Sequence, residues 1–313
     1  MKNITNIPAI DSSLIAPKYK AAVERTAQAV FRVCAFFTIL AVAAITLYMI
    51  LSGTPAILKV GLKEILFTTA WEPTAAQPKY GILYIILTSL VGTALAVLIG
   101  VLVGVLAAVF LAEMAGKTAK VVRSAVELLA GIPSVIYGLL GIYLLNPTMY
   151  RLELKLFKSS NTHQFTGGSN LLSAVLVLAI MILPTVINIS EAAIQAVDPG
   201  IRAASLALGG SRVQTIFKSV LPAARSGIVT AVVLGVGRAI GEAMAITLVS
   251  GGSVNAPLPF SSVRFLTTAI VSEMGYSTGT HRQMLFTIGL VLFGFIMLLN
   301  FGLSNILKET TCD

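Results

Sequence analysis

Long apolar runs alternate with shorter polar segments along most of this chain. Each run is near the ~20 residues that an α-helix needs to cross a bilayer. We place six of them, at about 30–52, 81–112, 124–146, 171–194, 226–251 and 284–306. The pattern predicts an all-α membrane protein with six transmembrane helices.

The composition agrees with this prediction. Of the 313 residues, 56% are hydrophobic and only 11% are charged, whereas ordinary soluble domains carry about 25% charged residues. In a membrane protein the net charge of +9 is first a signal of topology. We expect the lipid bilayer as a partner and no nucleic acid. The two cysteines, Cys34 and Cys312, do not make a disulfide framework.

The distribution of Lys and Arg among the loops predicts the orientation. If the N-terminus is inside, the inside segments carry more Lys and Arg than the outside ones, as expected of cytoplasmic loops. We therefore expect a multi-pass protein of the cell membrane with both termini in the cytoplasm. It would have a cytoplasmic N-terminal segment at 1–29, a transmembrane domain at 30–306 and a cytoplasmic tail at 307–313.

Two opposite charges lie inside the fifth apolar run. Arg238 and Glu242 are spaced i and i+4, so they would share one face of a helix. A charge at mid-bilayer costs about 2.5–3.5 kcal/mol on insertion scales, and it is tolerated when it pairs or faces a polar cavity. The pair could neutralise itself and fix the orientation of the helix, or it could line a substrate path, which is the interpretation we favour.

The chemistry of this pair suits an oxyanion. The arginine fork donates two parallel hydrogen bonds, which match a tetrahedral oxyanion. Glu242 would repel a bare anion, but it could accept a proton-bearing oxygen or hold Arg238 until the substrate displaces it. Both roles are hypotheses.

A proline lies inside the third run, in the string Gly131-Ile132-Pro133-Ser134-Val135-Ile136-Tyr137-Gly138. Proline removes a helix hydrogen bond and kinks the chain. In a membrane the freed backbone groups must find partners in protein or water, and Ser134 and Tyr137 offer hydroxyls nearby. The kink could serve packing alone, or it could line the substrate path together with these two side chains.

The residues of other kinds of site are missing or badly spaced. Gly116-Lys117-Thr118 lacks the earlier glycine of a phosphate-binding P-loop, because position 111 is Leu111. There is no Ser/His/Asp set and no zinc-type spacing, so we expect no catalytic residue, no metal site and no cofactor. His163 and His281 lie in outer loops without nearby cysteine or carboxylate partners, and we expect them to be solvated.

The polar segment before the fifth run has no spanning role. It predicts a short helix over 201–208, ended by Gly209-Gly210, and a second short helix over 212–220. Two short helices joined by glycine in a cytoplasmic loop suit docking into a groove on a soluble partner. A loop that lies on the membrane surface is the alternative.

This segment resembles a cytoplasmic loop of ABC-importer permeases. The family pattern is Glu-Ala-Ala, three residues, glycine, nine residues, an aliphatic residue, any residue and Leu-Pro. Its positions are taken here by Ala203, Ala204, Ser205, Gly209, Ser219, Val220, Leu221 and Pro222. Ala203 stands where glutamate is usual, so the contact of that carboxylate does not carry over. The resemblance implies that the segment at about 198–222, with Arg202 and Arg212 beside the motif, couples to a separate ATPase.

Two longer strings narrow the resemblance. The string at 131–138 and the string Gly-Val-Gly-Arg-Ala-Ile-Gly-Glu-Ala-Met-Ala at 235–245 are similar to the signatures of phosphate-importer permeases of the PstC type. The likeness covers most of 30–306 and implies the type I ABC-importer permease fold. It also implies three partners: a second permease of the PstA type, an ATP-binding dimer of the PstB type and an extracytoplasmic phosphate-binding protein of the PstS type. It makes Arg238 and Glu242 important for the passage of phosphate.

We therefore expect the permease subunit of an ATP-driven phosphate importer. It would form half of the translocation pore, and a partner subunit would hydrolyse ATP. A permease for molybdate or sulfate is the alternative within this class, although sulfate carries no proton at neutral pH for Glu242 to accept. A stand-alone secondary transporter would often show inverted repeats, and no convincing repeat is present. A membrane enzyme would need a catalytic set, which we do not find.

Overall fold

The structure is a computed structural model that describes residues 17–158 and 163–312. The chain forms two units, Met1–Leu51 and Ser52–Asp313, which are described separately. The described part of the first unit belongs to helix α1 (Pro17–Val60), whose last turns enter the second unit. Within α1, the stretch Val23–Val60 is long and apolar enough to cross a membrane.

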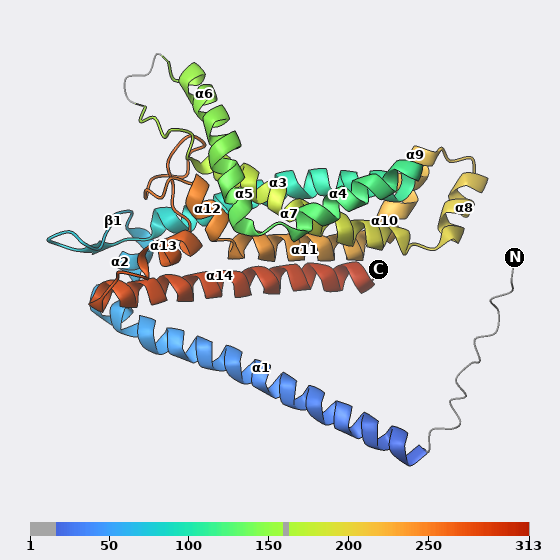
Figure 1. The fold of residues 1–313 in the computed structure, drawn as a ribbon, viewed down its shortest axis with the longest axis horizontal. Coiled ribbons are helices and arrows are strands. Elements are labelled where there is room, and N and C mark those ends of the chain that lie inside the picture. Colours follow the sequence, from blue (N-terminus) through green and yellow to red (C-terminus); the bar gives the residue numbers. More distant parts are fainter. Residues whose placement is uncertain (1–16, 159–162, 313) are drawn as a thin grey trace, which may run out of the picture. The chain divides into compact units, whose positions relative to one another are not determined.

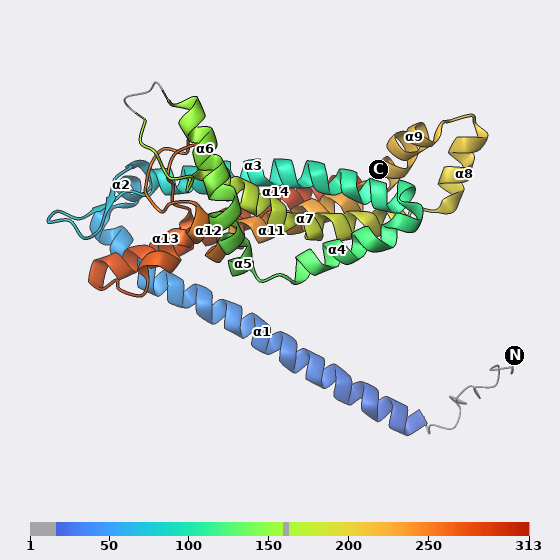
Figure 2. The same cartoon turned by 45° about the horizontal axis from the view of Figure 1, so that its top comes forward.

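Four long helices run side by side in the second unit (Figure 1). They are α3 (Leu83–Val109), α7 (Leu171–Gln195), α11 (Arg225–Gly241) and α14 (Gly279–Cys312). Helix α3 packs along α7, both contact α11, and α11 also packs against α14. The view turned by 45° in Figure 2 keeps the same neighbours together.

Shorter elements connect these helices. The α-helices among them are α2 (Leu62–Phe67), α4 (Ala119–Gly131), α5 (Ser134–Leu140), α6 (Asn146–Leu156), α8 (Pro199–Ala207), α9 (Arg212–Thr215), α10 (Leu221–Ala223), α12 (Met244–Val249) and α13 (Leu266–Glu273). Phe110–Met114, Gly141–Leu145 and Ile216–Val220 are π-helical, and Gly116–Thr118 is a 3₁₀ turn. Strands β1 (Trp71–Glu72) and β2 (Lys79–Tyr80) form an antiparallel hairpin in which Trp71 pairs with Tyr80 and Glu72 with Lys79.

The prediction of a helical membrane protein is confirmed. Within the described residues, four single helical stretches are long and apolar enough to span: Val23–Val60, Leu83–Met114, Leu171–Gln195 and Gly279–Gly302. Two bent pairs pass the same test, Ala119–Gly131 with Ser134–Leu156 at 100° and Arg212–Ala223 with Arg225–Gly241 at 70°. Six spans result if each bent pair counts as one. The predicted third span is broken between Gly131 and Ser134, whereas the second bend, at Ala224, lies just before the predicted fifth span.

The core that positions the site surrounds the middle of α7. Leu178 and Ile182 of α7 are buried together with Ala96 of α3 and Ile246 of α12. A Cβ on Gly100 of α3 would lie 2.5 Å from Ile182, so α3 and α7 approach each other as closely as small residues permit in lipid.

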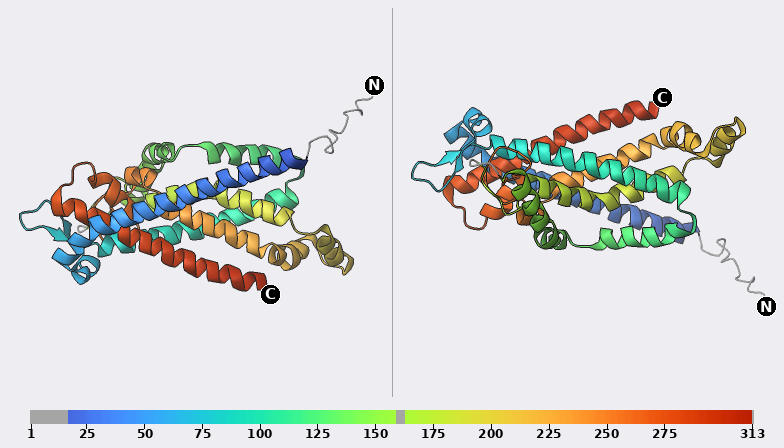
Figure 3. Two further views of the ribbon diagram at one scale, coloured as in Figure 1. Left: turned by 90° about the horizontal axis from the view of Figure 1, so that it is seen from below. Right: turned by 90° about the horizontal axis from the view of Figure 1, so that it is seen from above.

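The two ends of the second unit carry different elements (Figure 3). Helices α8 and α9 project at one end. The hairpin β1–β2, helix α13 and the loop between α12 and α13 lie at the other end (Figure 1). This separation matches the predicted alternation of loops, in which the segment at 198–222 lies opposite the loops at 53–80 and 252–283.

Candidate functional site

The predicted kink at Pro133 is a complete break in the helix. Helix α4 ends at Gly131, Ile132 and Pro133 are extended, and α5 begins at Ser134. Pro133 has no N–H, so the carbonyl four residues earlier, on Leu129, loses its regular donor. The hydroxyl of Tyr137 donates to this carbonyl at 2.7 Å. The same carbonyl also accepts from the Ile132 N–H at 3.2 Å, so Tyr137 is a second donor to it and joins α5 to the end of α4.

A second break separates Arg238 from Glu242. Helix α11 ends at Gly241, Glu242 is extended (φ −73°, ψ 130°), and α12 begins at Met244. The expectation that Arg238 and Glu242 share one face of a continuous helix is therefore wrong. Side chains replace the lost helix bonds here: Glu242 Oε1 accepts from the Ala245 N–H at 2.9 Å, and Thr267 Oγ1 donates to the Glu242 carbonyl at 2.7 Å.

Arg238 is half-buried and faces helix α7. Its Nη1 donates to Thr185 Oγ1 at 3.3 Å. No ion pair joins Arg238 to Glu242 in the part of the chain that the structure describes. The guanidinium thus meets a neutral hydroxyl and retains donors for another acceptor.

The two breaks lie next to each other, because α5 packs against α12. A Cβ on Gly138 of α5 would lie 2.7 Å from Leu248 and 2.9 Å from the backbone of Ala245. Tyr137, which bridges the first break, is buried in the same cluster as Ala239, the neighbour of Arg238 in α11. Ser134, the half-buried first residue of α5, has no recorded hydrogen bond of its side chain among the described residues.

Two glycines on one face of α11 have no close neighbour among the described residues. A Cβ on Gly237 or on Gly241 would meet nothing within 4 Å, whereas Gly235 lies against Val186 of α7. Two glycines four residues apart form a small-xxx-small face, which allows close approach of another helix in lipid. Such a face suits a partner from another subunit.

The predicted short helices at 201–208 and 212–220 are present. Pro199 opens α8 after Asp198, whose side chain accepts from the Gly200 N–H, and Gly209 ends the helix with φ +83°. Ser211 and Gln214 form a capping box at the start of α9. Exposed apolar side chains gather on this segment, namely Ile201, Leu206, Leu208, Val213 and Phe217.

The residues predicted for the coupling segment do not all point outward. Ala203, Ala204, Gly209, Arg212 and Pro222 are exposed, and Leu221 is partly buried. Ser205 Oγ lies 2.9 Å from Thr215 Oγ1 and joins the two short helices. Arg202 turns inward to Glu113, with 2.7 Å between Nη2 and Oε1.

The two histidines are not solvated, so that expectation is wrong. His163 Nε2 lies 2.8 Å from Oε1 of the fully buried Glu153, and His281 Nε2 lies 2.7 Å from Oε2 of the buried Glu273. Each glutamate precedes its histidine by ten or fewer residues, a spacing that could have indicated the pairs. The described residues hold no cluster of three metal-ligating side chains.

Glu273 is the centre of a polar cluster at the end of the second unit that carries the hairpin β1–β2. It also accepts from Trp71 Nε1, at 3.1 and 3.2 Å to its two oxygens, and it pairs with Arg264. Trp71 packs edge-on against Tyr80, and burial raises the pKa of the Tyr80 phenol. The cluster fastens the hairpin to α13 and to the start of α14.

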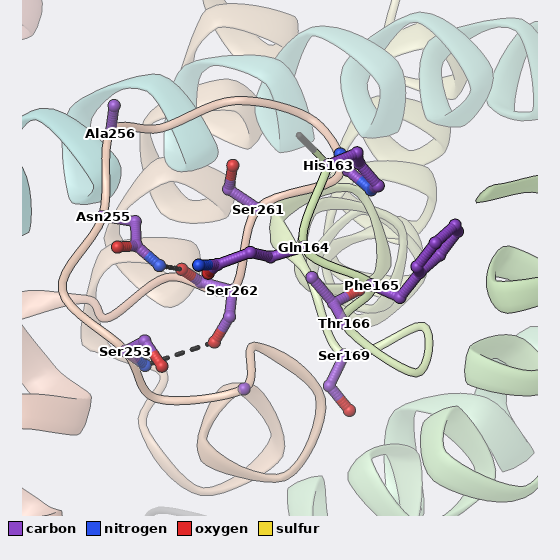
Figure 4. Close-up of a pocket in the computed structure, with 11 residues that line it drawn as sticks. His163, Gln164, Phe165, Thr166, Ser169, Ser253, Asn255, Ala256, Ser261 and Ser262 are labelled. Atoms are coloured by element: carbon purple, nitrogen blue, oxygen red, sulfur yellow. Dashed lines mark hydrogen bonds between the residues drawn. The ribbon is translucent and has the colours of Figure 1, made fainter. Parts of the chain in front are cut away.

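A polar cavity of about 730 Å³ opens beside His163 (Figure 4). Neutral hydroxyls and amides from the loops at 163–169 and 251–262 line it. Within its wall, Asn255 Nδ2 donates to the Ser262 carbonyl at 3.0 Å, and the Ser253 N–H donates to Ser262 Oγ at 3.3 Å. The string at 250–262, with four serines and one asparagine, is the sequence signal for this cavity, which the sequence reasoning missed.

Comparisons with known proteins place this geometry in a family. The family model described as binding-protein-dependent transport system inner membrane component matches residues 100–308. A probable ABC transporter permease protein, YqgH of Bacillus subtilis, is 38% identical over 86% of this chain and 87% of its own length. The phosphate transport system permease proteins PstC of Haemophilus influenzae and of one strain of Xylella fastidiosa are 31% and 33% identical. They cover 83% and 82% of this chain and 85% and 82% of their own lengths.

A solved structure shares the fold. An inward-facing structure of the MetNI methionine ABC transporter superposes with a TM-score of 0.51 and 20% identity, over 71% of this chain and 93% of that chain. At this identity the likeness concerns the fold alone, which is that of a type I ABC-importer permease.

Proposed function

The chain belongs to the family of binding-protein-dependent transport system inner membrane components, and on that premise we propose that it carries phosphate across the membrane. It is a multi-pass permease subunit and not an enzyme. As a permease of an ABC importer it works with a separate ATPase and a binding protein. We further propose that these partners are of the PstB and PstS types and that a second permease of the PstA type completes the pore.

The observation that carries the phosphate proposal is the state of Arg238. The structure describes a half-buried guanidinium whose recorded side-chain partner is the neutral hydroxyl of Thr185. A cation at this depth in a membrane is expensive unless it is compensated, and a planar fork is suited to two oxygens of a tetrahedral anion. Similarity to two PstC proteins over more than four fifths of this chain supports phosphate as that anion.

Glu242 supports phosphate over sulfate. One of its oxygens accepts from the Ala245 N–H, and its other oxygen has acceptor capacity left. Phosphate near neutral pH carries a proton that could be donated to this carboxylate, whereas sulfate carries none. Molybdate and sulfate remain the alternatives within this class of permease.

The face formed by Gly237 and Gly241 supports a pore made with a second permease. Among the described residues nothing lies within 4 Å of a Cβ added to either glycine, and both lie on the helix that carries Arg238. The exposed apolar side chains of α8 and α9 support docking of the ATPase at the segment 198–222. An orientation with that segment inside agrees with the excess of Lys and Arg, which supports both termini in the cytoplasm.

Reconstitution tests the proposal. The chain is purified with its second permease and ATPase, inserted into liposomes with ATP inside, and supplied outside with the binding protein and labelled phosphate or sulfate. We expect ATP-dependent uptake of phosphate and none of sulfate. Uptake of sulfate in preference to phosphate would favour the alternative, and uptake of phosphate without the ATPase would contradict the ATP-driven class.

A further inference from the structure

The side chain of Arg202 joins the coupling segment to two membrane helices. Arg202 lies in α8, yet its guanidinium points away from the exposed side of that helix. Nε and Nη2 donate to Glu113 Oε1 at 3.0 and 2.7 Å. Nη1 donates to the carbonyl of Val197 at 2.7 Å, and Nη2 also donates to the carbonyl of Ile194 at 2.8 Å.

These acceptors belong to the ends of α3 and α7. Glu113 is in the π-helical segment that continues α3, and Ile194 and Val197 are in the last turn of α7 and just beyond it. The last carbonyls of a helix lack regular donors, and a cation there also interacts favourably with the helix dipole. One arginine fork therefore joins α8 to the end of α7 and to the end of α3, which lies about 90 residues earlier in the chain.

The ion pair is shielded more than an ordinary surface pair. The side chain of Arg202 is 24% exposed and that of Glu113 is 15% exposed, so salt screens their attraction less than it screens exposed charges. The end of α7 has a second tie of the same kind, because the buried Glu191 accepts from Arg123 of α4 and from Gln195. The end of α7 is thus fixed to α3, α4 and α8.

Apolar side chains of α8 and of the residue after it are open to a partner. Ile201, Leu206 and Leu208 are exposed, Leu208 at 90%. Apart from the Arg202 fork, α8 is linked to α7 through the three residues at 196–198. It is also joined through Ser205 and Thr215 to the segment 212–220, whose Ile216 packs in a buried cluster with residues of α3 and α7. The fork adds a direct polar contact from α8 to the ends of both membrane helices.

We infer that Arg202 is a positioning residue for coupling: it transmits displacement of α8 to α3 and α7 together. This inference rests on the proposed function, since it needs an ATPase that docks on α8. Helix α7 carries Thr185, the partner of Arg238, and α3 packs along α7. Movement of their inner ends therefore reaches the site of the two helix breaks.

The test measures coupling and docking separately. The full complex is reconstituted with wild-type chain, Arg202→Gln, Arg202→Lys, Glu113→Gln or the double variant Arg202→Gln/Glu113→Gln. Arg225→Gln is the matched control, because Arg225 lies at the same end of the unit, outside the segment 198–222, and has no recorded ion pair among the described residues. The readouts are retention of the ATPase through purification, ATP hydrolysis, and phosphate imported per ATP hydrolysed.

We expect Arg202→Gln to retain the ATPase and its hydrolysis but to import about tenfold less phosphate per ATP, in the range of ordinary coupling energies. Glu113→Gln and the double variant should show a similar loss, because removal of one partner already breaks the tie. Arg202→Lys should fall between Arg202→Gln and wild type, since a single ammonium does not reproduce the fork. Arg225→Gln should match wild type.

Two outcomes overturn the inference. The first is an unchanged ratio of phosphate to ATP in Arg202→Gln and Glu113→Gln. The second is loss of the ATPase subunit from both Arg202→Gln and Arg202→Lys, which would assign Arg202 to docking. A wild-type complex that imports no phosphate would instead contradict the proposed function, whatever the variants do.

Discussion

At the scale of single residues, the surroundings of Arg238 most directly suggest a role in binding the transported anion. We expect Arg238→Gln to lower phosphate uptake by about ten- to a hundredfold, because a hydrogen bond to a charged group contributes about 1.5–3 kcal/mol. Arg238→Lys keeps the charge but loses the guanidinium fork, so phosphate uptake by this variant should lie between that of Arg238→Gln and that of wild type. Uptake by the reconstituted complex measures both, with Arg225→Gln on the same helix as control.

Arg238→Gln could also fail for reasons of assembly, so the amount of assembled complex is compared first. Variants that assemble like wild type and import phosphate at the wild-type rate would remove Arg238 from the path. Its contact with Thr185 would then serve only to hold α11 against α7.

Glu242 has a structural role, as a hydrogen-bond acceptor at the start of α12, that can be tested separately from its charge. Its Oε1 accepts from the Ala245 N–H at the start of α12, a contact that glutamine can keep and alanine cannot. We expect Glu242→Ala to destabilise the subunit by about 1 kcal/mol, as loss of a helix cap does, and Glu242→Gln to leave the melting temperature nearly unchanged. Phosphate uptake should fall in both variants, because both lose the carboxylate.

Thermal unfolding of the purified complex and uptake in liposomes together check this prediction. If Glu242→Gln and Glu242→Ala lowered the melting temperature equally, the charge of Glu242, and not its hydrogen bond to the Ala245 N–H, would stabilise the break. Full uptake by Glu242→Gln would mean that no protonated oxygen of the substrate needs the carboxylate.

At the scale of elements, the two helix breaks differ in how much of them the sequence predicts. The break at 132–133 follows from Pro133, which lacks an N–H. The break at 242–243 contains no proline and no positive-φ glycine. It depends on contacts made after folding, such as the hydrogen bond from Thr267 of α13 to the Glu242 carbonyl. Spacing along one helix therefore led to a wrong geometry for Arg238 and Glu242.

The pairs His163–Glu153 and His281–Glu273 were harder to predict. Their short spacing in the sequence was a signal, but hydrophobic periodicity does not fix which polar side chains turn inward. The short helices at 201–208 and 212–220 were predictable, because glycines and capping residues mark their ends locally.

The packing of α5 on α12 gives a prediction for these elements. A Cβ on Gly138 would lie 2.7 Å from Leu248 and 2.9 Å from the Ala245 backbone. Gly138→Ala should therefore destabilise the subunit by about 1–3 kcal/mol, the usual cost of overpacking a core. Gly294→Ala in α14 is the matched control, since a Cβ there meets nothing within 4 Å. A melting temperature of Gly138→Ala equal to that of the control would mean that α5 and α12 are less tightly packed.

At the scale of the whole molecule, the second unit holds its site between two specialised ends. Helices α8 and α9 present exposed apolar side chains at one end, and a polar cluster around Glu273 secures the loops at the other. The long helices α3 and α7 connect these ends, and Arg238 contacts α7 between them. This arrangement suits a subunit that receives a displacement on one side and changes access to a site within the bilayer.

The face of α11 that carries Gly237 and Gly241 tests whether this chain is half of a pore. Neither glycine has a neighbour within 4 Å of an added Cβ, so Gly237→Leu should leave the fold of the chain itself unchanged. It should weaken association with the second permease, because the close helix approach that small residues allow is lost. Gly294→Leu is the control: Gly294 also lacks a close neighbour and lines a separate cavity of about 290 Å³ that can hold the added side chain. Co-purification of the second permease measures the effect. Retention of that permease by Gly237→Leu at the level of Gly294→Leu would place the contact between the two permeases on another helix.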